Sequence, residues 1–186
     1  MAYSDNDFRG PYSEADVFDL FDKHGVYYKR RPERYNMLVG SPYEQMKNPQ
    51  YWVAYHTESN KPIAVHGVGE WKNVYLGAGL ASYGKETDLP QDETEGAGQA
   101  VANYVVSKHG DKPFVIFTNE RSKRIFNGVG FSDVEFDEDG SVVGQDDVPE
   151  DVVDTIERLK AKGNPSTAVR KLLLRYADSW FVGLKV

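Results

Sequence analysis

The chain has 186 residues, of which 40% are hydrophobic, so it can bury a full core and most simply forms one domain. Its formal net charge of −7 argues against a nucleic-acid-binding surface as the main function, because phosphate recognition depends on clustered Lys and Arg. The absence of cysteine excludes a disulfide framework, a thiolate nucleophile and a cysteine-ligated zinc site.

The N-terminal residues carry neither a basic start nor an apolar core, so they do not form a signal peptide. No apolar run approaches the roughly 20 residues that span a bilayer. The four histidines lack ligand spacing, so we predict no metal site. We therefore expect a cytoplasmic protein that binds neither membrane nor nucleic acid, and the sequence leaves its oligomeric state open.

The first half of the chain reads as a helix followed by an antiparallel meander. The first dozen residues fit either an edge strand or an ordered arm. Ser13 and Asp16 form a capping-box pattern that predicts a helix ending near Gly25. Three strands are then predicted, at Tyr51–His56, Ile63–Trp71 and Val74–Tyr83.

Two glycines inside the third strand, Gly77 and Gly79, weaken it unless something requires them. A ligand that closely approaches the backbone is one reading, and a bulge or tight side-chain packing is the other. Both stay open at this stage.

A crossover from strand to helix to strand follows. Residues 85–95 form a polar loop that we place on the surface. An amphipathic helix is predicted from Gly96 to His109, and the continuous apolar run 114–117 predicts a strand buried on both faces. Together these elements make a β-α-β unit.

The last part of the chain adds helices and a final strand. We predict a short helix over 121–127, a strand beginning at 134–136, and a C-terminal strand over 180–186. Two helices, 149–162 and 165–176, lie between the last two strands. The domain organisation is therefore a single domain over 1–186, with a helical insertion at about 148–176 before the C-terminal strand.

Glycines directly before a helix free backbone N–H groups to face an anion, and the helix dipole adds partial positive charge there. Gly96 and Gly98 occupy such positions, and this geometry suits a pyrophosphate. A plain helix-start turn is the alternative, because the pattern matches neither the dinucleotide fingerprint nor a P-loop. The residues of the predicted cradle are Glu95, Gly96, Ala97, Gly98 and Gln99.

In order and spacing, these elements resemble the GNAT superfamily of acyl-CoA-dependent N-acyltransferases. The pattern is carried by the turn Glu93–Gly98, the buried strand, Asn119, the helix around Ile125 and the closing Gly130-Phe131. The resemblance implies an α+β fold with three αβα layers: a mixed, mostly antiparallel sheet with a splayed central parallel pair and helices on both faces.

The resemblance also implies acetyl-CoA as co-substrate, with its pantetheine arm lying between the splayed strands as an extra strand. An acetyl or similar group would pass to a primary amine of a small molecule, peptide or protein by direct attack, without a covalent intermediate. Asn119 and Phe126 would join the cradle residues in holding the cofactor.

Two positions depart from the family pattern. Glu93 stands where the family has Arg or Gln, and Phe126 stands where a tyrosine protonates the leaving thiolate. Tyr83, Tyr104 or a water molecule stays open as the acid. Glu70 and His66 share one face of a strand and are candidates for the base, although an exposed hairpin residue and a structural histidine are the plainer readings.

These departures support a second hypothesis from a different class. A GNAT-like fold with altered chemistry would act as a structural or protein-interaction module, docking a partner through its acidic loop and added helices.

Overall fold

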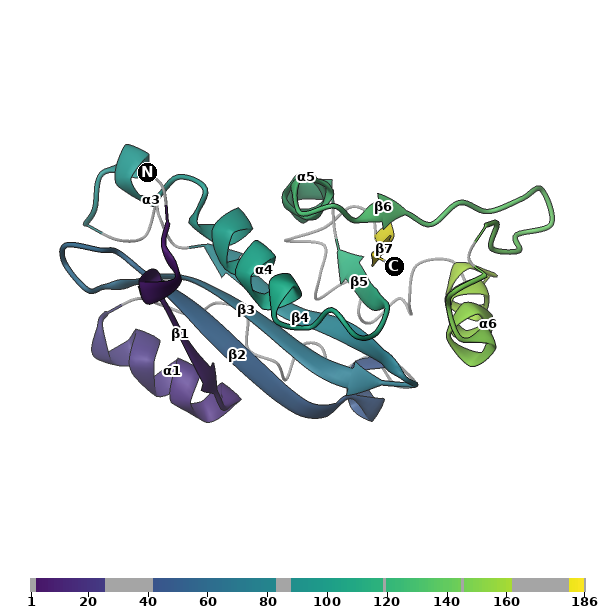
Figure 1. Cartoon of the computed structure of the whole chain (residues 1–186), viewed down its shortest axis with the longest axis horizontal. Helices are drawn as coiled ribbons and strands as arrows, with labels where there is room; N and C mark the ends of the chain where they lie inside the picture. Colours follow the sequence, from purple (N-terminus) through teal and green to yellow (C-terminus); the bar gives the residue numbers. More distant parts are fainter. Residues whose placement is uncertain are drawn as a thin grey trace.

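A single mixed sheet forms the centre of the computed structural model, which describes residues 3–25, 42–82, 88–118, 120–144, 146–161 and 181–185 (Figure 1). Its seven strands run in the order β1-β2-β3-β4-β5-β7-β6. The strands are β1 (Phe8–Tyr12), β2 (Lys47–Tyr55), β3 (Pro62–Trp71), β4 (Val74–Ser82), β5 (Phe114–Thr118), β6 (Ser132–Asp133) and β7 (Phe181–Lys185).

The described helices lie between these strands. They are α1 (Glu14–Lys23), α3 (Gln91–Thr94), α4 (Ala97–Ser107), α5 (Glu120–Gly128) and α6 (Glu150–Ala161), with 3-10 turns η1 (Asp5–Asp7) and η2 (Pro42–Gln45). Ser13 caps α1 through the predicted capping box, its hydroxyl accepting from the Asp16 backbone N–H.

The predicted antiparallel meander of β2, β3 and β4 is confirmed. Strand β1 pairs with β2, which shows that the N-terminal residues 8–12 form an edge strand. Strand β2 begins at Lys47, earlier than predicted, because its first residues are polar and include Pro49, which hides the strand pattern. The register shifts in this extension, where Asn48 has a φ of 50°.

Helices cover both faces of the sheet, so the predicted three-layer α+β fold is confirmed. Alternation along β3 divides the core: Ala64 and Val68 pack with α4, whereas Val65 packs with the buried face of α1. Figure 1 shows α4 lying across the meander strands. Helix α6 packs on the α1 side, against the cluster that contains Leu76 and Val115.

Three local predictions differ from the structure. The loop expected over 85–95 contains the short helix α3, which begins after Pro90, a residue suited to a helix start. The strand expected at 134–136 is only an isolated bridge between Phe136 and Val142, and β6 lies just before it. Helix α6 matches the first inserted helix, whereas the second, over 165–176, lies outside the described residues.

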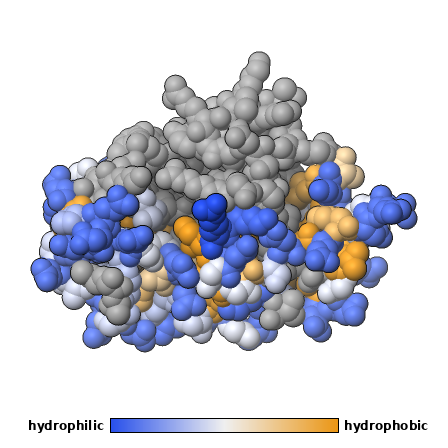
Figure 2. All heavy atoms as spheres, turned by 90° about the horizontal axis from the view of Figure 1, so that it is seen from above, coloured by the Kyte–Doolittle hydropathy of each residue, from blue (hydrophilic) through white to orange (hydrophobic). Residues whose placement is uncertain are grey.

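The sequence contains 29 acidic and 22 basic residues. Figure 2 shows a mostly hydrophilic described surface on the face it presents, with apolar side chains confined to separate patches. Within the described ranges, no helix combines the length and apolarity that crossing a membrane requires.

Candidate functional site

The parallel strands β4 and β5 pair over only a short distance and then part. Their register is Tyr75 with Phe114, Leu76 with Val115, and Gly77 with Ile116. Beyond these pairs β4 continues to Ser82 and β5 to Thr118, and their described residues there do not pair with each other. We call these segments, β4 beyond Gly77 and β5 beyond Ile116, the strand divergence. The predicted splay of the central parallel pair is thus confirmed.

A bulge in β4 lies directly at the strand divergence. The pairing between β3 and β4 jumps from Gly67 opposite Ala78 to Val65 opposite Ala81. Two β4 residues therefore face the single residue His66 on β3. A bulge of this kind interrupts the hydrogen-bond ladder and redirects backbone groups, so it supplies polar backbone atoms beside the divergence.

Gly77 is required by side-chain packing. A Cβ at this position would lie 2.6 Å from Ile116 Cγ2 and 3.4 Å from His66 Cε1. This close approach favours the packing interpretation of Gly77 over the close-ligand interpretation, both of which the sequence left open. It also brings His66 to the last paired residue of β4.

His66 is buried at the strand divergence, with 1% of its surface exposed. Its ring lies 5.5 Å from the Phe126 ring, centroid to centroid. Neither ring nitrogen has a hydrogen-bond partner among the described residues. Burial, together with the nearby charge of His109, lowers the pKa of His66 to about 3, so the imidazole is neutral at physiological pH.

Tyr43, which the sequence analysis missed, lies on the opposite face of the sheet at the same place. Its hydroxyl is 3.3 Å from the Gly77 carbonyl oxygen and 3.4 Å from that of Phe117, both of which accept from it. Tyr43 comes from η2 and is itself buried. It links the two strands where they part. No motif marks this residue, because its partners lie far away in the chain.

The predicted turn before α4 has the expected backbone form. Gly96 is the N-cap residue with a φ of +80°, a left-handed conformation that favours glycine, and no side chain caps the helix. A Cβ on Gly98 would lie 3.4 Å from Ser82 Cβ and 3.6 Å from Ile125 Cδ1. The start of α4 therefore lies between the end of β4 and α5, and Ala97 and Gly98 are buried there.

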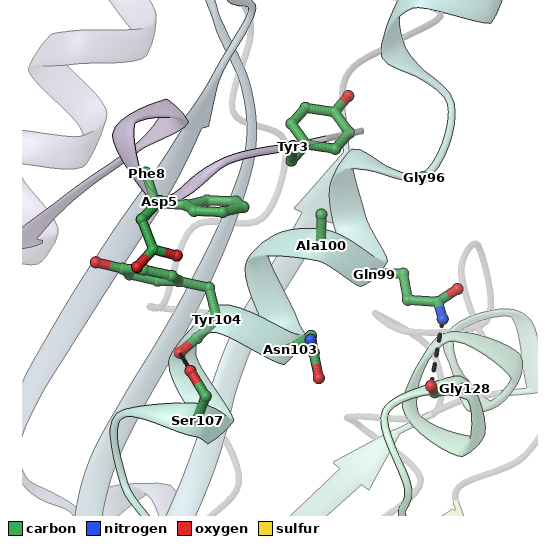
Figure 3. Close-up of a pocket in the computed structure, with 10 residues that line it drawn as sticks. All are labelled: Tyr3, Asp5, Phe8, Gly96, Gln99, Ala100, Asn103, Tyr104, Ser107 and Gly128. Atoms are coloured by element: carbon green, nitrogen blue, oxygen red, sulfur yellow. Dashed lines mark hydrogen bonds between the residues drawn. The ribbon is translucent and has the colours of Figure 1, made fainter. Parts of the chain in front are cut away.

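A pocket of about 460 Å³ extends along α4 (Figure 3). It includes the predicted residues Gly96 and Gln99. Gln99 donates a hydrogen bond to the Gly128 carbonyl oxygen at 3.3 Å and so links α4 to α5. Tyr104, one of the open candidates for the acid, also lines the pocket. The other lining residues, which the sequence analysis did not select, are Tyr3, Asp5, Phe8, Ala100, Asn103, Ser107 and Gly128.

A sequence signal for part of this pocket was available. Gln99, Asn103 and Ser107 recur every four residues and form a polar stripe on one face of α4. The residues from the N-terminal region could not be found in this way. Phe8 stacks on Tyr104 with ring centroids 4.5 Å apart, a contact between distant parts of the chain.

The Glu93 carboxylate faces the end of the meander. Its Oε2 lies 3.1 Å from Nε2 of the buried His56, while 37% of the Glu93 side chain is exposed. The distance allows an ion pair with a protonated imidazole, although the contact does not have hydrogen-bond geometry. His56 in turn contacts Ser59 through Nδ1 at 2.9 Å. The residue that departs from the family pattern thus has a partner within the protein.

The N-terminal region is anchored beside His56 by Asp7. The Asp7 carboxylate accepts from the Ser4 backbone N–H at 2.8 Å and from the Thr57 hydroxyl at 3.0 Å. Hydrogen bonding from the Ser4 backbone is the main cause that lowers the pKa of Asp7, and the charge of His56 contributes. These contacts hold one wall of the pocket.

The other predicted site residues lie in different surroundings. Glu70 is four residues from His66 on β3, and its carboxylate lies 3.3 Å from Lys112 Nζ, with 48% of its side chain exposed. It pairs with Tyr75, where β4 and β5 are still together. Phe126 is buried against His66 and Phe131. Tyr83 and Asn119 lie outside the described residues.

The described residues bring together His66, Phe126 and the cradle around Gly96 near one end of the parallel pair. They do not bring Glu70 to the same place. Glu95 is exposed just before the turn. Over the described ranges, no group of three or more His, Asp or Glu side chains is arranged to hold a metal ion.

Fold and site together define a class: a GNAT-like architecture, in which a central parallel strand pair parts beside a helix that begins at a glycine turn. No protein-family model matches the chain, and no curated protein matches it. Matches are found among solved structures.

Three of these structures illustrate the similarity. Rv2747 from Mycobacterium tuberculosis, in complex with CoA and NLQ, is 15% identical over 96% of this chain and 98% of its own, with a TM-score of 0.49. NAA60 from Arabidopsis thaliana, in complex with acetyl-CoA, is 12% identical over 96% of each chain, with a TM-score of 0.48. ElaA from Escherichia coli is 12% identical over 72% of this chain and 93% of its own, with a TM-score of 0.42.

Proposed function

We propose that the protein is a divergent GNAT-family N-acyltransferase that uses acetyl-CoA or a related acyl-CoA. The observation that carries this proposal is the parting of β4 and β5 after the Gly77–Ile116 pair. Parted strands present backbone N–H and C=O groups to a third extended segment, and a pantetheine arm, with its two amides, has this chemistry.

The start of α4 supports the second half of the proposed cofactor site. Uncapped N–H groups in the first turn of a helix bind phosphate well, helped by the helix dipole. Residues 95–99 would hold the pyrophosphate through backbone groups, while Asn119 and Phe126 would line the acyl end. The contact of Glu93 with His56 weakens the objection that this carboxylate repels phosphate, because it holds the carboxylate against the β2–β3 connection, to which His56 belongs.

The proposed reaction is direct acyl transfer. The acyl-CoA supplies an activated thioester, and the neutral amine of the acceptor attacks its carbonyl carbon. Backbone N–H groups of the β4 bulge are suited to polarise that carbonyl. The amine loses one proton to a base, for which Glu70 and His66 remain the candidates from the sequence, whereas Tyr83 remains a candidate for the acid. His66 lies nearest the strand divergence, and Glu70 would need a water chain.

The acceptor in this proposal is a primary amine on a small molecule, peptide or protein. The net charge of −7 favours a cationic acceptor in the encounter. We further propose that residues 1–186 act as one cytoplasmic domain, with the helical segment at about 148–176 inserted before β7.

Calorimetric titration with acetyl-CoA tests the proposed cofactor site. We expect saturable one-site binding that is lost in Gly98→Leu, because the larger side chain would fill the region next to Ser82 and Ile125. Gly110→Leu is the matched control, since a Cβ there would have no neighbour within 4 Å among the described residues. Absence of binding heat at millimolar acetyl-CoA would overturn the proposal.

An amine panel then separates the two function classes. Wild-type protein that binds acetyl-CoA should acetylate at least one class of amine, and the product should be absent in Gly98→Leu. Tight binding without transfer to any amine would favour the alternative, a GNAT-like fold with altered chemistry that acts as a structural or protein-interaction module.

A further inference from the structure

His66 is an unusual residue for a protein core. Its side chain is buried, and both ring nitrogens lack a hydrogen-bond partner among the described residues. Buried polar atoms in proteins nearly always have partners, because a buried polar atom left unpaired loses the hydrogen bonds that it makes with water in the unfolded chain. An imidazole in this state therefore points to a partner that arrives from outside the chain.

The position of His66 indicates where that partner would bind. Its Cε1, the atom between the two ring nitrogens, lies 3.4 Å from the place of a Cβ on Gly77, the last β4 residue paired with β5. The β4 bulge faces His66 across the β3–β4 ladder. On a third side stands the ring of Phe126. The unpaired nitrogens thus lie at the strand divergence.

Phe126 supplies the second observation. In the family pattern this position carries a tyrosine whose hydroxyl serves the leaving sulfur, and Phe126 has no hydroxyl. The imidazole of His66 is a polar group that lies close to the Phe126 ring, at 5.5 Å between centroids. A histidine on β3 is thus placed where it can supply the hydrogen bond that a phenylalanine on α5 cannot.

We propose that His66 donates a hydrogen bond to the sulfur atom of the acyl-CoA thioester and stabilises the thiolate that leaves. This inference rests on the proposed acyltransferase function. During transfer the amine nitrogen bonds to the carbonyl carbon, the carbon–sulfur bond breaks, and its electron pair stays on sulfur. The His66 N–H remains on the ring and donates to that sulfur, while the proton lost by the amine goes to a base or to water.

The electrostatic surroundings suit a donor that keeps its proton. Burial and His109 hold the pKa of His66 far below neutrality, so the ring is a neutral imidazole with one N–H at pH 7. His109 is the charged group that contributes to the lowered pKa of His66. The His109 ring packs between Trp52 and Tyr75, and its Nδ1 contacts the Val105 carbonyl oxygen at 2.8 Å. A neutral imidazole does not transfer a proton as an imidazolium cation would, but its N–H can donate a hydrogen bond.

The thiol pKa of bound CoA tests this directly and needs no knowledge of the acceptor. Free CoA and CoA bound to wild-type protein are titrated by the ultraviolet absorbance of the thiolate. A charge-assisted hydrogen bond should lower the bound thiol pKa by about one to two units relative to a bound state without it. We expect this shift in wild type, its loss in His66→Phe, and its partial return in His66→Gln, which restores an N–H donor.

His24→Phe is the matched control, because His24 is an exposed residue at the end of α1. The ¹⁵N shifts of the His66 ring in wild-type protein give a test without any core substitution. They should move on addition of CoA, whereas the phosphorylated nucleotide part of CoA, added without the pantetheine arm and its sulfur, should leave them unchanged. Unchanged ring shifts with CoA bound, or equal thiol pKa values in wild type and His66→Phe, would overturn the role of His66 alone. Failure of CoA to bind at all would overturn the proposed function with it.

Discussion

At the scale of single residues, Glu93 shows how a local environment changes the meaning of a sequence position. A carboxylate beside a pyrophosphate site is unfavourable by simple Coulomb repulsion. Here its Oε2 lies 3.1 Å from Nε2 of His56, at the end of the meander. The sequence shows that position 93 carries a carboxylate but not which residue that carboxylate contacts, because Glu93 and His56 are far apart in the chain.

The buried imidazole of His66 should make stability depend on pH. The unfolded chain binds a proton at His66 below about pH 6.5, whereas the folded pKa is about 3. The unfolded state therefore binds more protons between these values, so the stabilising contribution is present above pH 6.5 and is lost as pH falls toward 3. His66→Phe should remove a slope of up to about 1.4 kcal/mol per pH unit.

Urea unfolding of both proteins between pH 7 and pH 5 measures this slope. The quantity to compare is the difference in free energy of unfolding between wild type and variant at each pH, because the other titrating groups contribute equally to both proteins. Parallel stability curves over this range would show that His66 is solvated or paired in the folded protein.

The two glycines at the start of α4 should respond differently to alanine. Gly96 has a φ of +80°, and a left-handed conformation costs an L-residue about 1–2 kcal/mol. Gly98 is helical, and its added Cβ would make only ordinary contacts at 3.4 Å or more. We expect Gly96→Ala to lower the free energy of unfolding by about 1 kcal/mol and Gly98→Ala to leave it unchanged or raise it, by up to about 1 kcal/mol.

Chemical denaturation of both variants measures the difference. Equal destabilisation by the two substitutions would mean that the turn does not hold Gly96 in the left-handed region.

At the scale of elements, the strand divergence depends on close packing at the last pair before the strands part, Gly77 with Ile116. A Cβ on Gly77 would lie 2.6 Å from Ile116 Cγ2, a distance at which one of the strands must shift. Tyr43 joins the same two strands from the opposite face through the carbonyl oxygens of Gly77 and Phe117. The strands are thus held together at one end, which defines where they part.

A double-mutant cycle tests this packing. Gly77→Ala alone should destabilise by about 1–3 kcal/mol through overpacking, and Ile116→Ala alone by about 2–5 kcal/mol through the cavity it leaves. In the double variant the new methyl group occupies part of that cavity, so its destabilisation should be smaller than the sum by about 1 kcal/mol or more. Additive effects would show that the two side chains do not meet.

The elements themselves were predictable to an unequal extent. The meander, α4 and β5 have strong periodic patterns, and the sequence predicts them with small errors at their ends. The strand β1, the start of β2 and the helix α3 were missed or left undecided, because polar residues and prolines hide their patterns. Their identity is set by pairing and packing with distant segments, which a local pattern does not contain.

The candidate site was predictable only where backbone chemistry defines it. The glycine turn at Gly96 follows from the sequence, since its φ requirement is local. Tyr43 and the pocket residues Tyr3 and Phe8 could not be found, because their contacts are with β4, β5 and α4. His66 was found as a candidate, but its burial and lack of partners among the described residues appear only in the fold.

At the scale of the whole molecule, one sheet brings these parts together. The N-terminal region and α3 meet at Glu93 and His56, α4 covers the meander, and α5 closes over the strand divergence through Phe126 and the Gln99–Gly128 hydrogen bond. A bound acyl-CoA that lies between β4 and β5 would extend this sheet by one strand-like segment. Its binding should therefore rigidify the centre of the molecule.

Hydrogen–deuterium exchange with and without acetyl-CoA tests this central claim most directly. Amide protons in β4 beyond Gly77 and in β5 from Ile116 onward should gain protection on binding, as should those in the first turn of α4, because each would meet a hydrogen-bond acceptor or a less exposed environment. Peptides from β1 and α1 should exchange unchanged and serve as internal controls. Binding that protects other segments and leaves the two parted strands unprotected would contradict the account.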